Sequence, residues 1–99
     1  MYHKNIDIDG KTAEGYVIPL GKVNLVFAIV PEGMVGCGAL DVAVLDKFDY
    51  PAAKIGSTDG NPVLTLDNLL DGIVKEVNET ASKKGIKKGI SGREALKLF

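Results

Sequence analysis

The chain has 99 residues, of which 45% are hydrophobic and 25% charged, and its formal net charge is −1 at pH 7. This length fits one domain, residues 1–99, that buries roughly 65% of the surface exposed by the unfolded chain. One cysteine excludes an intrachain disulfide, and the longest apolar run, residues 25–31, is far shorter than the roughly 20 residues that span a membrane. We therefore expect a soluble protein of the reducing cytoplasm that makes no membrane contact.

The N-terminal region predicts β-strands that meet in a hairpin. Apolar residues alternate with polar ones up to Asp9-Gly10, a dipeptide typical of a two-residue hairpin turn, and residues 12–20 resume as a second strand. Residues 23–30 are mostly apolar, which is typical of a central strand covered on both faces. A hairpin of this kind leaves an unpaired strand edge, so residues 1–30 predict an oligomerisation region.

The next segment predicts a strand, a helix and a second strand. Residues 34–37 should return antiparallel to the strand before them, because Pro31 and Gly33 favour a turn. Apolar residues then recur at helical spacing after Asp41, whose carboxylate can cap the first free amides of that helix. Residues 52–56 form the second strand, and the crossover is right-handed if the two strands are parallel.

Apolar residues with a period of 3.6 predict a long helix over residues 66–84. Thr65 can cap the start of this helix and Gly85 its end. Gly72 weakens the middle by about 1 kcal/mol relative to Ala, which leaves a kink or a break into two pieces open.

A short final helix follows Ser91. Ser91 and Glu94 match a capping box, in which the serine side chain accepts a hydrogen bond from the Glu94 amide and the glutamate reaches back. The predicted fold is therefore α+β. It has an N-terminal β-hairpin, a mixed sheet of about five short strands, one helix between strands, and two C-terminal helices in a helical region of about residues 65–99.

Charge is distributed unevenly along the chain. Residues 1–82 carry six Lys and twelve Asp or Glu, whereas residues 83–99 carry six Lys or Arg and one Glu. Lys87, Lys88 and Arg93 would gather around the amides that open the final helix, an arrangement suited to an anion. A solvated helix end explains the same lysines. Nucleic acid is the less favoured partner, because stacking aromatic side chains or a basic domain would be expected for it.

Cys37 is the only cysteine, and glycines flank it at a predicted strand-to-helix turn. As a catalytic nucleophile it would need a base and oxyanion donors. The amides of Gly38 and Ala39 could be the donors, and Asp41 could orient the base. The only histidine, His3, lies in an N-terminal segment of a kind that is commonly mobile, so a base would have to be presented by a neighbouring subunit. The same residues suit a small buried cysteine packed in a tight turn, and both interpretations stay open.

Polar residues at the mouth of the central strand predict a ligand site around the same cysteine. Lys22 and Asn24 begin this strand, and Gly36 allows a ligand to approach the backbone beside Cys37. Asn24 would need a hydrogen-bond partner if buried, and a backbone group in the preceding turn would serve as well as a ligand.

No metal and no cofactor are expected. One cysteine and one histidine cannot furnish the ligand set of a structural zinc site. The acidic residues show no calcium-loop spacing, and no Walker or dinucleotide-binding motif is present.

Several ordered motifs carry a resemblance to a known family. They are Leu20-Gly21-Lys22-Val23-Asn24-Leu25, the Cys-Gly-x-Leu-Asp core within residues 33–41, residues 66–70, Gly85-Ile86, and Gly89-Ile90-Ser91-Gly92-Arg93-Glu94-Ala95-Leu96. Together they resemble the YunC-like family of small bacterial and archaeal proteins, a domain of unknown function, over nearly the whole chain after Asp9. The resemblance implies N-terminal strands that mediate tetramerisation, and it implies no established reaction. The chain departs from the family pattern at Gly36, where a bulky apolar residue is usual, and at Ile90, where methionine is frequent.

The sequence thus favours an uncharacterised homo-oligomer, preferably a tetramer, that binds or scaffolds and has a small-molecule site near Cys37. Two alternatives stay open. One is a cysteine-dependent enzyme with Cys37 as its nucleophile. The other is an anion or nucleic-acid binder that uses the basic C-terminal segment.

Overall fold

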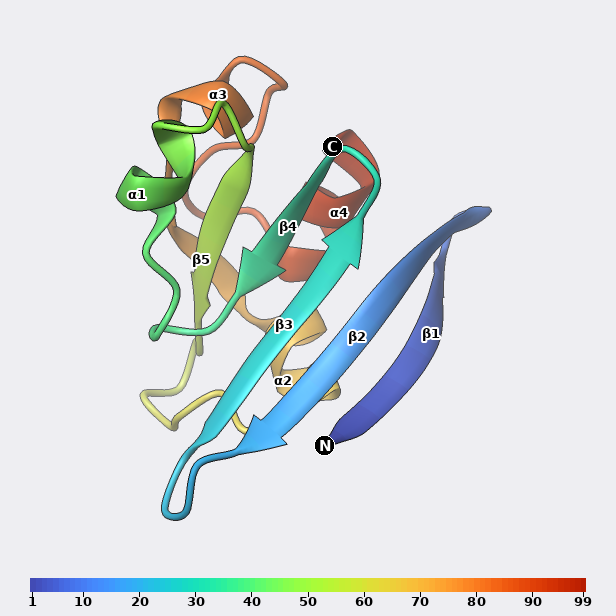
Figure 1. The fold of residues 1–99 in the computed structure, drawn as a ribbon, viewed down its shortest axis with the longest axis vertical. Coiled ribbons are helices and arrows are strands. Elements are labelled where there is room, and N and C mark those ends of the chain that lie inside the picture. Colours follow the sequence, from blue (N-terminus) through green and yellow to red (C-terminus); the bar gives the residue numbers. More distant parts are fainter.

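The computed structural model describes residues 1–99, which form one mixed β-sheet with short helices (Figure 1). The strands are β1 (Tyr2–Ile8), β2 (Lys11–Pro19), β3 (Asn24–Val30), β4 (Gly33–Gly36), β5 (Ala52–Gly56) and β6 (Ile73–Val77). The helices are α1 (Val42–Asp46), α2 (Leu66–Asp71), α3 (Glu79–Ser82) and α4 (Gly92–Leu98). The predicted α+β class is confirmed, although the sheet has six strands rather than about five.

Strand order in the sheet equals chain order, from β1 at one edge to β6 at the other. Neighbouring strands are antiparallel except β4 and β5, which run parallel and are connected through α1. The predicted strand–helix–strand unit is therefore confirmed. Because β4 and β5 are parallel, their carboxyl ends lie at the same edge of the sheet.

The N-terminal hairpin turns at Asp9 and Gly10, as the sequence predicts. Both residues have positive φ, 52° and 86°, as a two-residue type I′ turn requires. Asp7 Oδ1 supports the turn by accepting a hydrogen bond from the Gly10 amide at 3.0 Å. The turn sets Ile8 opposite Lys11. A slip by one residue would turn the buried Ile8 out of the core, so the register is fixed.

The long helix predicted over residues 66–84 is wrong, because the chain there forms α2, β6 and α3 in succession. Gly72 follows α2 directly. A Cβ at position 72 would lie 2.6 Å from the carbonyl oxygen of Gly56, so the chain passes closely against β5. The next segment is rich in β-branched residues and pairs with β5 as an edge strand. The apolar residues of the predicted stripe are therefore divided among α2, β6 and α3. The C-terminal region, expected to be helical, contains a strand as well.

One hydrophobic core lies between the sheet and the helices α2 and α4, which pack behind the sheet in Figure 1. Its fully buried side chains include Val26, Val35, Ile55, Leu69 and Leu96. None of the helices has the length and apolar character needed to cross a bilayer.

The opposite side of the sheet carries a half-exposed apolar surface, which we call the open face. It consists of Tyr16, Ile18, Phe27, Ile29 and Met34. Alternate residues of the same strands, such as Val26 and Ala28, are fully buried on the helix side. Tyr16 stacks between His3 and Phe27, with ring centroids 4.6 and 5.1 Å away. Within one chain, β3 is therefore fully covered on one face only.

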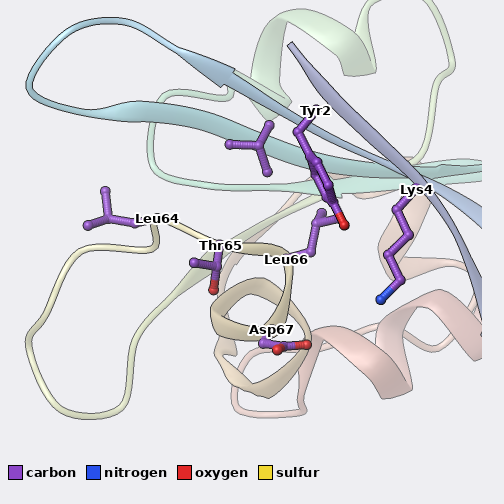
Figure 2. Close-up of a pocket in the computed structure, with 7 residues that line it drawn as sticks. Tyr2, Lys4, Leu64, Thr65, Leu66 and Asp67 are labelled. Carbon is purple, nitrogen blue, oxygen red and sulfur yellow. The ribbon is translucent and has the colours of Figure 1, made fainter.

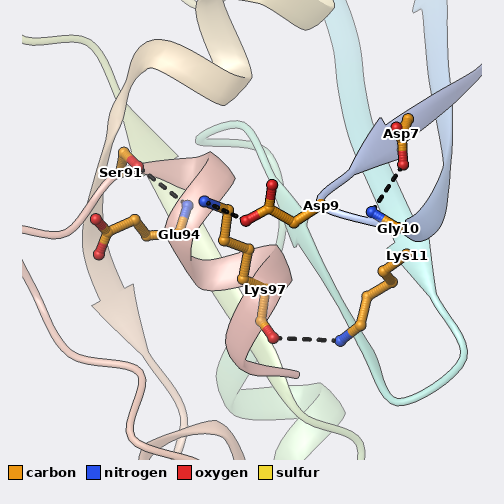
Figure 3. A network of polar contacts seen from close by, with 7 residues as sticks. All are labelled: Asp7, Asp9, Gly10, Lys11, Ser91, Glu94 and Lys97. Atoms are coloured by element: carbon orange, nitrogen blue, oxygen red, sulfur yellow. Dashed lines mark hydrogen bonds and ion pairs between the residues drawn. The ribbon is translucent and has the colours of Figure 1, made fainter.

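Polar contacts tie the N-terminal hairpin to α4 (Figure 3). Lys11 Nζ donates hydrogen bonds to the carbonyl oxygens of Leu96 and Lys97, at 3.3 and 3.4 Å, and to that of Phe99. Lys97 Nζ in turn forms an ion pair with Asp9 at 3.2 Å. The last carbonyls of a helix have no partner within it, so Lys11 satisfies groups that water would otherwise bind.

The predicted caps at Thr65 and Ser91 are confirmed. Thr65 Oγ1 accepts from the Asn68 amide, and Ser91 Oγ accepts from the Glu94 amide (Figure 3), each at 3.0 Å. The Glu94 carboxylate makes no return bond to the backbone. The expected capping box is therefore only half formed.

Candidate functional site

A cavity of about 380 Å³ lies at the carboxyl ends of β4 and β5, and we call it the Cys37 pocket. Its walls come from the turn between β2 and β3, from the loop after β4 and from the loop after β5. Ligands in open α/β sheets commonly bind outside the carboxyl ends of parallel strands. The position of the pocket therefore follows from the one parallel strand pair in this sheet.

Thirteen residues line the Cys37 pocket, and no Asp, Glu, Lys, Arg or His is among them. With 25% of the chain charged, about three charged residues would be expected in a set of thirteen. The wall is mainly apolar and includes Leu20, Val23, Cys37, Ile55, Val63 and Leu64. Leu20 and Val23 are 57% and 52% exposed at the mouth. The sequence pattern predicts no apolar wall here, and the one local signal for it is the pair of apolar residues, Leu20 and Val23, that flank the Gly21 turn.

Cys37 belongs to this wall but is only 5% exposed. Its amide donates to the Val26 carbonyl at 2.9 Å, and its Sγ accepts from the Val26 amide at 3.4 Å. The thiol donates to the Asn24 carbonyl oxygen at 3.9 Å. These contacts fix the sulfur against β3 and leave little access for an incoming reagent.

The other residues of the predicted nucleophilic site do not gather around the sulfur. His3 lies on β1, where it stacks on Tyr16 and pairs with Glu14, Nε2 to Oε1, at 3.5 Å. Asp41 caps α1, because its carboxylate accepts from the Val44 amide at 3.1 Å. A single chain therefore brings neither a base nor an orienting carboxylate to the thiol.

Gly38 and Ala39 line the pocket, and their amides have no hydrogen-bond acceptor within the chain. Both residues belong to a turn that the Leu40 amide closes by donating to the Cys37 carbonyl at 3.0 Å. Two backbone donors beside the cysteine are thus free for a ligand.

Of the residues predicted to surround a ligand, Asn24 and Cys37 meet in the pocket, whereas Lys22 and Gly36 do not line it. Asn24 Nδ2 donates to the carbonyl of Leu64 at 2.9 Å, so its partner lies in the loop after β5 rather than in the preceding turn. Lys22 is exposed in the turn between β2 and β3. Gly36 packs under another side chain, since a Cβ there would lie 2.9 Å from Leu40 Cδ2.

The loop after β5 is held by Asp59. Its Oδ1 accepts from the Asn61 amide at 3.0 Å. This bond, followed by contacts from the Asn61 and Ser57 side chains, lowers the pKa of Asp59 below its ordinary value. The bond to the Asn61 amide thus orders the loop that carries Ser57 and Asn61, which both line the Cys37 pocket.

The residues of the predicted anion site, Lys87, Lys88 and Arg93, are exposed before and within the start of α4. None of them forms an ion pair with an acidic side chain. Two amides at the start of α4 are already used: that of Gly92 donates to the Gly72 carbonyl at 3.1 Å, and that of Glu94 donates to Ser91 Oγ at 3.0 Å. None of these three cations lines a cavity.

A second cavity, of about 350 Å³, lies between the start of β1 and the start of α2 (Figure 2). Tyr2 and Lys4 come from β1, and Leu66 and Asp67 come from α2. No local pattern in the sequence predicts this cavity, because its walls come from two segments that are far apart in the chain.

Comparisons with known proteins find relatives across nearly the whole chain. Residues 36–99 match a family described as "Domain of unknown function (DUF1805)". The uncharacterized protein YunC of Bacillus subtilis (strain 168) is 39% identical over 92 residues, covering 92% of this chain and 89% of that protein. The crystal structure of a protein of unknown function, TA1206 from Thermoplasma acidophilum, has a TM-score of 0.85 at 28% identity and covers 99% of this chain and 92% of its own. The chain therefore belongs to the DUF1805 family, which agrees with the YunC-like resemblance of its motifs.

Proposed function

We propose that this protein is a cytoplasmic small-molecule-binding domain and that the Cys37 pocket is its binding site. The observation that carries the proposal is an apolar cavity with two unpaired backbone amides at the carboxyl ends of β4 and β5. A volume of about 380 Å³ suits a small ligand, since ligand pockets usually span roughly 300–1,000 Å³. The relatives are uncharacterised, so the ligand has to be argued from this chain.

Burial of the thiol supports binding rather than catalysis. A nucleophilic cysteine needs access to its substrate and a nearby base. Cys37 is 5% exposed, its sulfur is engaged with β3, and His3 lies on β1 in the same chain. In this proposal Cys37 shapes the pocket wall and performs no chemistry.

The binding proposal is tested by a fragment screen on the intact protein with labelled methyl groups. Neutral apolar fragments should shift the NMR signals of the Ile55 and Val63 methyls and leave the distant Val44 methyls unchanged. Gly38→Leu should abolish the shifts, because nothing lies within 4 Å of a Cβ at position 38 and the new side chain would extend from the pocket wall. Ser82→Leu, on the exposed surface of α3, is the matched control. The proposal fails if no fragment shifts the pocket methyls, or if binding survives Gly38→Leu.

The same proposal includes self-association through residues 1–30, with a tetramer as the preferred assembly. The half-exposed side chains of the open face support it, because a soluble chain gains from covering a contiguous apolar surface. The free edge of β1 also supports it. In a two-residue hairpin, Ile8 and Lys11 exchange hydrogen bonds, so the backbone groups of His3, Asn5 and Asp7 point away from β2.

A second copy can pair antiparallel with this edge in a register centred on Asn5. Each His3 then lies opposite an Asp7, which places groups of opposite charge side by side when the imidazole is protonated. The full length of β1, Tyr2–Ile8, overlaps with its partner in this register. Such pairing would also remove the exposed strand edge.

A further inference from the structure

We infer that the Cys37 pocket is built for an apolar ligand that carries an uncharged carboxamide. This inference rests on the proposed function, because it names the ligand class of the same pocket. Three observations lead to it: the wall carries no charge, it offers two free hydrogen-bond donors, and it offers a free acceptor.

The lack of charge argues against an ionised ligand. None of the thirteen lining residues is an acid, a lysine, an arginine or a histidine, and Lys22 lies outside the wall. A carboxylate placed against Val63 would lose hydration that no cation of the wall replaces, and an ammonium group would leave the free amides of Gly38 and Ala39 without an acceptor. The polar part of the ligand is therefore neutral.

The two donors are the backbone amides of Gly38 and Ala39. They belong to consecutive residues that line the pocket, and neither donates to any group of the chain. A carbonyl oxygen has two lone pairs and can accept from both donors. Donors left unpaired when a ligand excludes water would weaken binding, so the ligand should supply this acceptor.

The acceptor is the side-chain oxygen of Asn24. The amide nitrogen of Asn24 donates to the Leu64 carbonyl, while Oδ1 receives no hydrogen bond from the chain. An N–H group of the ligand can donate to this oxygen. A carboxamide supplies both a carbonyl oxygen and an N–H group, whereas a ketone or an ester lacks the donor.

The inference is first tested on the unmodified protein with two probes of nearly the same shape, hexanamide and hexanoate. Their hydrocarbon chains are the same, so the apolar wall contributes equally to both. We expect hexanamide to bind at least about tenfold more tightly at neutral pH, as judged by the shifts of the Ile55 and Val63 methyl signals during titration.

The free donor is tested by two substitutions at one position. Gly38 is the second residue of its turn, where proline is favoured, and Gly38→Pro removes the free N–H without removing a hydrogen bond of the chain. Gly38→Ala keeps the N–H and places its Cβ in open space. We expect Gly38→Pro to weaken hexanamide binding about fivefold and Gly38→Ala to bind like the unmodified protein.

The outcomes separate this inference from the proposal on which it rests. If neither probe and no neutral fragment shifts the pocket methyls, the proposed function fails. If neutral fragments bind but hexanoate matches or exceeds hexanamide, or if a folded Gly38→Pro variant binds hexanamide unchanged, the pocket stands and the carboxamide assignment is overturned. Should Gly38→Pro not fold, the relative affinities of hexanamide and hexanoate for the unmodified protein still decide whether the carboxamide assignment holds.

Discussion

At the scale of single residues, the neighbouring strand determines the environment of Cys37. Val26 on β3 bonds to both the amide and the sulfur of Cys37, and the Asn24 carbonyl accepts from the thiol. The glycine after Cys37 leaves room on the pocket side, yet the sulfur itself stays 5% exposed. A small residue fixed in this way maintains the shape of the pocket wall.

Alkylation rates test this view of the thiol. We expect native Cys37 to react with iodoacetamide at least about tenfold more slowly than the same thiol in the chain unfolded by guanidinium, because local opening must precede attack. Mass spectrometry of samples quenched over time gives both rates. A native rate equal to the unfolded rate would show an exposed, reactive thiol and would favour the enzyme alternative.

The serine cap of α4 is a second test at this scale. Ser91→Ala should lower the free energy of unfolding by about 1 kcal/mol, since the Glu94 amide loses its acceptor. The comparison is made from urea midpoints at unchanged slope. Glu94→Gln should cost less, because the carboxylate makes no return bond. An equal loss in both variants would mean that the complete capping box forms in solution.

At the scale of elements, the short helices depend on contacts with their neighbours. The clearest such contact joins α1 to α3: Asp46 Oδ1 accepts from the Thr80 hydroxyl at 2.5 Å and from the Thr80 amide at 3.0 Å. The hydroxyl bond first, and then the amide bond, lower the pKa of Asp46 below its ordinary value of 3.8. Helices of four and five residues would not persist alone, so these bonds position both helices.

Removing the hydroxyl should change stability in a pH-dependent manner. Thr80→Ala should be less stable than the unmodified protein at pH values above the ordinary pKa of Asp46, 3.8. The difference should shrink as pH falls through the lowered pKa of folded Asp46, because protonation removes the charged acceptor in both proteins. Urea midpoints from about pH 6 to about pH 2.5 measure the difference. Ser82→Ala, on the same helix, is the control, and a difference independent of pH would contradict the assignment.

Local sequence signals predict most of the helices, strands and turns. They fail over residues 66–84, where the chain forms α2, β6 and α3 instead of one helix. Asp9-Gly10, Asp41, Thr65 and Ser91 act through their own backbone and nearest neighbours, so the turn and the caps could be predicted. The strand β6 exists because β5 offers it a partner and because Gly72 passes within contact of Gly56. The strand β5 lies outside residues 66–84, so the 3.6-residue period of that segment carries no information about pairing with β5.

The candidate site has the same limitation at the scale of the whole molecule. Its position near Cys37 could be predicted from the glycine-flanked cysteine and from Asn24. Its apolar wall could not, because residues from β2–β3, β4 and the loop after β5 meet there only in the folded chain. Lys22 and Gly36 were expected to contact a ligand, but neither lines the pocket. The turn between β2 and β3 exposes Lys22 to solvent, and Leu40 covers Gly36.

Self-association is also a property of the whole molecule, and Asn5 offers a selective test. The backbone of Asn5 points away from β2, so Asn5→Pro should leave the hairpin intact and remove a donor needed for pairing at the edge. We expect light scattering to give a multiple of the single-chain mass for the unmodified protein and a smaller multiple for Asn5→Pro. Asn5→Ala, which keeps the donor, should behave like the unmodified protein. A single-chain mass for the unmodified protein would refute self-association, and an unchanged mass for Asn5→Pro would exclude the β1 edge.

The agreement between strand order and chain order bears on how the protein folds. Each strand pairs with the one before it, so the sheet can grow by successive short-range steps, which favours rapid folding. The contact between Lys11 and Leu96 spans 85 positions and closes a very large loop. During synthesis the sheet would therefore form while the helix side of β1 and β4 still lacks α4, and that incomplete intermediate is the form most exposed to aggregation or to capture by a chaperone.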